Sequence, residues 1–67
     1  MIEITINGEA RQIDGPMPIA ELVRRAEVPE HYLAIEINGD VVPRESHATV
    51  LVNAGDVVEV VTLVGGG

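Results

Sequence analysis

Two Asn-Gly dipeptides, Asn7-Gly8 and Asn38-Gly39, restrict the fold of this chain more than any other feature of its sequence. A type I′ turn needs positive φ at both central residues, which Asn and Gly adopt readily, so each dipeptide predicts a tight β-hairpin. The residues before each turn, 2–6 and 33–37, alternate apolar and polar side chains as half-buried strands do. The chain is therefore expected to contain two hairpins.

The returning strand of each hairpin is less regular than the strand before it. Residues 9–13 should form the first returning strand, with Arg11 at an edge, its aliphatic stem covering apolar surface and its guanidinium in water. The second returning strand is short, because Pro43 follows Val41-Val42 and cannot donate to a ladder. Residues 44–48 are expected to form a loop, and 49–52 are a short apolar segment of undefined geometry.

A single amphipathic helix is predicted between the two hairpins. Its apolar face recurs at helical spacing and consists of Ile19, Leu22, Val23 and Ala26. Pro18 suits the first helical position, which makes Met17 the N-cap. The helix must stop by Val28, because Pro29 disfavours the α conformation in the residue before it.

The last strand is expected over residues 57–62, after a turn at 53–56, and it leads directly into the C-terminal glycines. Together the elements predict an α+β domain at residues 1–62, in which one main helix covers a mixed four- to five-stranded sheet whose centre is the first and last strands. The other sheet face is then open, and one alternate set of the last strand lies on it. Candidate docking residues there are Val57, Val61 and Leu63.

Composition excludes several classes of function. The chain of 67 residues carries a net charge of −7, with no lysine and no cysteine, which disfavours nucleic-acid binding, disulfides and thiolate chemistry. An acidic surface would instead steer the chain towards a basic groove on another protein. Without a signal peptide or an apolar run long enough to cross a membrane, a cytoplasmic location is expected.

Side-chain chemistry is sparse. His31 and His47 are predicted to be ordinary surface histidines, because a metal site needs more ligands at reinforcing spacing. Glu45, Ser46 and His47 are consecutive, and consecutive residues cannot generally form a hydrolase triad. No phosphate-binding loop is present, so the chain is expected to bind no metal or cofactor and to be no enzyme.

The C-terminal segment Val64-Gly65-Gly66-Gly67 remains as the candidate for function. A glycine run is slim and flexible, so a free carboxylate at its end could enter a narrow active site of another protein. The simpler alternative is a frayed chain end. The Gly67 carboxylate is a poor acyl donor until another enzyme activates it, and without lysine a sister molecule offers only its α-amino group as an acceptor.

The whole chain resembles the ThiS family, the β-grasp (ubiquitin-like) sulfur carriers of thiamine biosynthesis. The resemblance rests on the segment from Ala34 to Arg44, which contains Asn-Gly-Asp-Val-Val-Pro-Arg, and on Ala54 to Val61 followed by the terminal glycines. Two departures are Met17, where Thr is common, and His47, where the family often has Trp.

The resemblance implies a mechanism. An E1-like enzyme, ThiF, would adenylate the Gly67 carboxylate with ATP and Mg²⁺, and sulfur from a cysteine desulfurase or a related donor would replace AMP. The resulting thiocarboxylate would deliver sulfur to thiazole synthase, ThiG. Gly66 and Gly67 match the terminal glycine pair of the family, and Gly65 and Val64 would enter partner active sites with them, so that residues 63–67 act as a flexible tail.

Two other interpretations stay open at this point. The chain could be a MoaD-like carrier that supplies sulfur for molybdopterin or another pathway, since that family has the same fold and tail. It could also be a non-covalent β-grasp interaction module whose glycines are incidental. The first alternative differs in the partner enzyme, and the second predicts no covalent change at Gly67.

Overall fold

The computed structural model describes residues 1–28 and 32–62, which are the predicted domain apart from residues 29–31. The elements in chain order are β1 (Ile2–Ile6), β2 (Glu9–Ile13), β3 (Met17–Pro18), α1 (Ile19–Arg25), β4 (Ala34–Ile37), β5 (Asp40–Val42), the 3₁₀ helix η1 (Arg44–Ser46), β6 (Leu51–Val52) and β7 (Val57–Val61). The helix within these residues is too short to cross a membrane.

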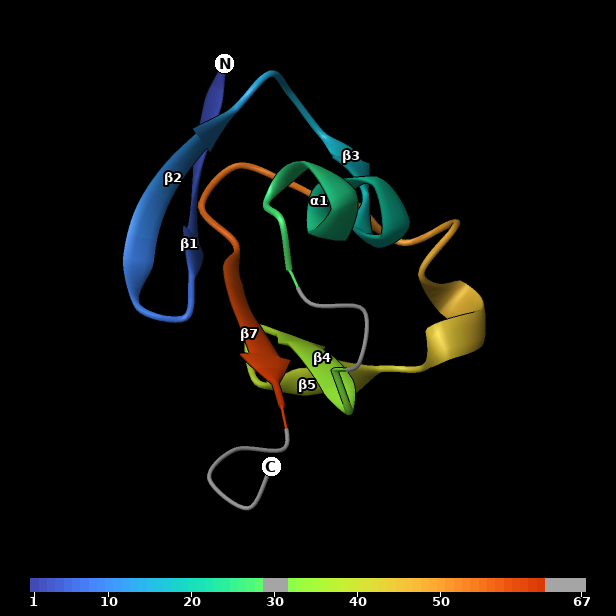
Figure 1. Cartoon of the computed structure of the whole chain (residues 1–67). Helices are drawn as coiled ribbons and strands as arrows, with labels where there is room; N and C mark the ends of the chain where they lie inside the picture. Colours follow the sequence, from blue (N-terminus) through green and yellow to red (C-terminus); the bar gives the residue numbers. More distant parts are fainter. Residues whose placement is uncertain (29–31, 63–67) are drawn as a thin grey trace.

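Five strands form one mixed sheet in the order β2-β1-β7-β4-β5 (Figure 1). The central pair, β1 and β7, is parallel, while the β1–β2, β4–β7 and β4–β5 pairs are antiparallel. The prediction of a mixed sheet with the first and last strands at its centre is confirmed. Parallel pairing brings the end of the chain back beside its beginning, which local hairpins alone could not do.

Both Asn-Gly turns have the predicted backbone. Asn7 and Gly8 have φ of 49° and 83°, and Asn38 and Gly39 have φ of 53° and 89°. Positive φ at both central residues gives the turn the twist of the strands that it joins. The turns fix the register at Ile6 opposite Glu9 in one hairpin and Ile37 opposite Asp40 in the other.

The helix differs from its prediction at both ends. Pro18 is the N-cap, and Met17 pairs with Val52 in a separate two-stranded sheet, so the expectation of Met17 as N-cap was wrong. The helix ends at Arg25, before the limit set by Pro29, because Glu27 takes φ of 57° and turns the chain away. The predicted loop at 44–48 contains η1.

The core lies between α1 and one face of the sheet. Ile19 and Leu22 of the helix pack with Ile4, Ile35 and Val58 of the three central strands, and all five are almost fully buried. Each of these strands contributes alternate residues to the core, as the sequence pattern predicts. The opposite set of side chains therefore faces away from the helix.

Candidate functional site

The C-terminal tail predicted as the functional arm lies outside the described residues. This applies to Gly67, Gly66, Gly65 and Val64, and also to Leu63 among the docking candidates. The structure does describe the strand that leads to them, β7, and the surface around that strand. The base of the candidate site can therefore be built from its hydrogen bonds.

Side chains from both hairpin turns hold β7. On the β1 side, the Val60 N–H donates to Asn7 Oδ1 at 2.8 Å, and on the β4 side the Val57 N–H donates to Asn38 Oδ1 at 3.0 Å. Asn38 also donates through Nδ2 to Asp56 Oδ1 at 3.1 Å. The two asparagines thus replace ladder bonds where the neighbouring strands have turned away. Sequence analysis identified their turn conformation but not this second role.

The last described backbone bond of β7 is close to the tail. Val61 lies opposite Ala34, and the Leu33 N–H donates to the Val61 carbonyl at 2.7 Å. The chain is therefore anchored in the sheet as far as Val61, two residues before the tail begins. An anchored strand end gives the residues that follow it a defined starting point, which lowers the entropy lost when the chain end is positioned.

Two buried side chains, Tyr32 and His47, form a cluster beside this anchor, and the exposed residue Arg44 joins it. The Tyr32 hydroxyl lies 3.0 Å from His47 Nδ1, and His47 Nε2 lies 3.0 Å from the Val42 carbonyl. Because that carbonyl can only accept, Nε2–H donates to it, and in the neutral imidazole Nδ1 then accepts from the Tyr32 hydroxyl. Arg44 stacks on the Tyr32 ring at 4.5 Å and donates to the Tyr32 carbonyl at 2.6 Å.

The cluster corrects one prediction. His47 is 5% exposed and not a surface histidine, because both ring nitrogens have protein partners that replace water. His31 lies outside the described residues. With both nitrogens engaged, His47 is not available as a base or a metal ligand. No local pattern joins Tyr32 to His47, fifteen positions apart, so sequence periodicity could not reveal the pair.

The sheet face opposite α1 is partly apolar. Val57 and Val61, two predicted docking residues, are 43% and 39% exposed there, and Val41 of β5 is 61% exposed. Glu36 and Glu59 lie directly opposite each other between β4 and β7, on the same face. Like charges in a cross-strand pair repel. The face thus presents valines around a concentrated negative charge.

Comparison with known proteins gives this arrangement a context. The profile of the ThiS family matches residues 4–67. A thiazole synthase from Paramagnetospirillum magneticum is 38% identical over 66 residues, which cover 98% of this chain and 20% of that protein, so the chain spans a fifth of its length. An uncharacterized protein, ycf40, from Porphyra purpurea is 35% identical over 66 residues, covering 98% of this chain and 93% of that protein.

Two solved structures share the fold. The crystal structure of a thiamine biosynthesis protein, ThiS, from Geobacter metallireducens superimposes with a TM-score of 0.84 at 33% identity, over 98% of this chain and all of that one. A solution structure of a thiamine biosynthesis protein from the same organism gives a TM-score of 0.76 at 33% identity, over 98% of this chain and 88% of that one. The predicted β-grasp fold is thereby confirmed, and the chain belongs to the ThiS family, the sulfur-carrier proteins of thiamine biosynthesis.

Proposed function

We propose that this protein carries sulfur as a thiocarboxylate at Gly67 for assembly of the thiazole ring of thiamine. A ThiF-like enzyme joins the Gly67 carboxylate to the AMP portion of ATP, with Mg²⁺, and releases pyrophosphate. The persulfide of a sulfur donor such as a cysteine desulfurase then attacks the acyl carbon, and AMP leaves. A thiol reductant cleaves the S–S bond of the resulting acyl disulfide, which releases the donor as a thiol and leaves the thiocarboxylate at Gly67. The observation that carries the proposal is the family match, which extends through the terminal glycines at residues 4–67.

The partnership with a thiazole synthase has separate support. A protein named thiazole synthase contains a segment 38% identical to nearly the whole of this chain, which accounts for only 20% of that protein. A ThiS-like domain and the rest of that protein are therefore covalently joined. This favours a ThiG-like partner over the large subunit of molybdopterin synthase as the recipient of sulfur.

The geometry of the chain suits delivery at a distance. Five residues from Leu63 to Gly67 can span at most about 17 Å, at about 3.4 Å per residue. Glycine has no side chain to block entry into a narrow active site. A partner can thus hold the globule outside while the terminal carbon reacts inside. The folded domain positions the Gly67 carboxylate, and the partner enzymes catalyse its activation and the transfer of sulfur.

The open sheet face is the surface we propose for docking. Val57 and Val61 lie on the strand that leads to the tail, and the Glu36–Glu59 pair lies on the same face. A partner surface with apolar pockets around a lysine or arginine would bury the valines and neutralise the paired carboxylates. The net charge of −7 would accelerate such an encounter at low salt.

Intact-mass spectrometry tests the carrier function directly. The protein is incubated with ThiF, ATP, Mg²⁺, a desulfurase with cysteine, and dithiothreitol as the reductant, and its mass should rise by the replacement of one oxygen with sulfur. The same mixture without ATP should leave the mass unchanged. No mass change, with a ThiF shown to be active on its own carrier, would contradict the proposal and favour a non-covalent interaction module.

A further inference from the structure

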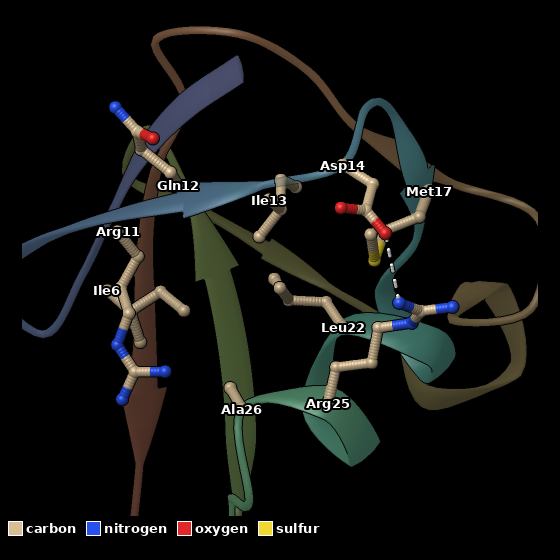
Figure 2. Close-up of a pocket in the computed structure, with 9 residues that line it drawn as sticks. All are labelled: Ile6, Arg11, Gln12, Ile13, Asp14, Met17, Leu22, Arg25 and Ala26. Carbon is tan, nitrogen blue, oxygen red and sulfur yellow. Dashed lines mark hydrogen bonds and ion pairs between the residues drawn. The ribbon is translucent and has the colours of Figure 1, made fainter. Parts of the chain in front are cut away.

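A groove runs between the edge strand β2 and helix α1 (Figure 2). Its deeper part is a cleft of about 170 Å³ with an apolar floor that includes Ile13, Met17 and Leu22. A second cleft of about 290 Å³ is lined by Glu9, Glu27 and Val28. Ile6, Arg11 and Ala26 line both clefts, so the two adjoin at Arg11. The groove is elongated along β2: one end has an apolar floor bordered by the Asp14–Arg25 ion pair, the middle carries Arg11, and the other end is acidic.

Strand β2 offers a free backbone edge beside this groove. It is the last strand of the sheet and pairs only with β1 among the described residues. Residues that flank a two-residue hairpin turn exchange both hydrogen bonds, and bonded pairs then alternate along the ladder. Because Ile6 and Glu9 flank the turn, the N–H and C=O groups of Ala10 and Gln12 point away from β1. These groups can accept another strand.

Arg11 gives the groove an unneutralised charge. Arg24 and Arg25 are ion-paired with Glu21, and Arg44 bonds to Tyr32. Within residues 1–28 and 32–62, the Arg11 guanidinium makes no hydrogen bond or ion pair. A cation over an apolar floor, on a chain of net charge −7, is a local site for a carboxylate.

A second copy of this chain fits the edge poorly. Antiparallel pairing of two β2 strands about a two-fold axis at Arg11 would place the two Arg11 side chains opposite each other. Like charges in directly opposed positions are destabilising. A two-fold axis at Ala10 would instead pair Arg11 with Glu9 of the second copy, but two chains of charge −7 repel each other at either register. The occupant should therefore be a strand of different sequence.

We propose that this groove binds an extended peptide segment of another protein, which adds to β2 as an antiparallel strand. The side chains of an added strand that face the groove lie beside Ile13, Arg11 and Glu9 in turn, two residues apart. The chemistry of these positions selects an aliphatic, an acidic and a basic residue, read from the N-terminus of the peptide as Ile-x-Glu-x-Lys. The aliphatic side chain fills the cleft over Leu22, the carboxylate pairs with Arg11, and the ammonium meets Glu9 and Glu27.

The groove and the open face can be occupied together. The groove lies at the edge of the face that α1 covers, whereas Val57 and Val61 lie on the opposite face. A protein held through β2 could thus remain bound while the tail engages an enzyme. The proposal does not depend on sulfur transfer, and its test requires no enzyme.

The test is titration of the ¹⁵N-labelled protein with the peptide acetyl-Thr-Ile-Thr-Glu-Thr-Lys-Thr-amide, followed by amide chemical shifts. We expect the largest shifts at Ala10, Gln12 and Ile13, with smaller shifts at Leu22 and Ala26. A control peptide with Glu and Lys exchanged has the same composition and should bind at least about tenfold more weakly, since it places like charges together. Arg11→Glu should abolish this preference, because each peptide then makes one opposite-charge and one like-charge pair with positions 11 and 9.

A second variant tests strand addition separately from charge. Ala10→Pro removes an outward N–H while sparing the ladder with β1, as proline is tolerated at sheet edges. This variant should lose peptide binding, and its own spectrum shows whether it is folded. The proposal is overturned if neither peptide shifts the amide signals of β2, or if the shifts are confined to the open face. It is also overturned if the Ile-x-Glu-x-Lys peptide binds the parent and Arg11→Glu with equal affinity. Concentration-dependent shifts at β2 without peptide would overturn it in favour of self-association.

Discussion

Glu27 occupies the position at which α-helices often carry glycine, the first residue after the C-cap Ala26. Its φ is 57°, and the flanking bonds run from the Val28 N–H to the Val23 carbonyl at 3.0 Å and from the Glu27 N–H to the Arg24 carbonyl at 3.3 Å. These are the two bonds of a Schellman motif. Left-handed backbone strains a residue with a Cβ by about 1–2 kcal/mol. The motif therefore terminates the helix at the expense of local strain.

Glu27→Gly should relieve this strain. We expect the free energy of unfolding to rise by about 0.5–1 kcal/mol, because the gain exceeds the entropy that glycine adds to the unfolded chain. Urea denaturation followed by circular dichroism measures the change. Glu27→Ala removes the same charge but keeps the Cβ, so it should give less than half of this gain. Equal stabilisation by both variants would assign the effect to charge at the helix C-terminus instead.

The Tyr32–His47 pair shows why the burial of His47 could not be predicted from the sequence. Histidine in a predicted loop is usually exposed, yet His47 is buried because η1 and the end of β5 direct its ring towards Tyr32 and the Val42 carbonyl. Such a buried hydrogen bond contributes about 1 kcal/mol only if both partners are present. The partner residues are distant in sequence, and no alternation or spacing links them.

Secondary-structure elements could be predicted from the sequence where residues close in the chain determine their conformation. The Asn7 and Asn38 turns and the alternating strands depend on neighbouring residues alone, and each was predicted correctly. Strands β3 and β6 have two residues each, too few for a period to be recognised. Their pairing depends on long-range closure of the chain. Helix α1 ends within the limit that Pro29 sets, but Glu27, which the sequence did not indicate as a breaker, and not the proline, ends it.

An ion-pair cluster on helix α1 should contribute to the way in which the free energy of unfolding falls at acidic pH. Arg25, and then Arg24, hold the pKa of Glu21 below its ordinary value of 4.5 through hydrogen bonds. A carboxylate with a lowered folded-state pKa stabilises the fold fully above its unfolded pKa and loses that contribution as pH falls through the folded pKa. The effect is small, because the groups are exposed and water and salt screen them.

Glu21→Gln should therefore flatten part of the decline in thermal unfolding midpoint between about pH 6 and about pH 3. Glu45→Gln is the matched control, since Glu45 is exposed and has no ion pair among the described residues. The difference between the variants should shrink in 1 M salt, where the screening length falls to about 3 Å. Identical pH profiles of Glu21→Gln and the parent at low salt would contradict the assignment.

At the scale of the whole molecule, the sheet divides the surface into two sides, and each carries one of the proposed binding surfaces. One face is covered by α1 and bordered by the β2 groove, while the other presents Val57 and Val61 beside the paired glutamates. Strand alternation predicted this division, but the Glu36–Glu59 juxtaposition required the register of β4 against β7, which no local pattern fixes. The functional tail at residues 63–67 was predicted from its glycines and from the resemblance to ThiS, and it stays a prediction.

The predicted division of the chain into a folded domain, residues 1–62, and a tail, residues 63–67, leads to a prediction for Gly67. Its deletion withdraws the terminal carboxylate by about 3.4 Å, and a misplacement of only about 1 Å can lower an enzymatic rate by about 100-fold. We therefore expect ThiF-dependent release of pyrophosphate from ATP to fall at least 100-fold, while the amide spectrum and the urea midpoint stay unchanged. Thr62→Ser keeps the length of the arm and should retain the parent rate. An undiminished rate after deletion would place the reacting group elsewhere, and loss of the folded spectrum would show that the terminal glycine stabilises the domain.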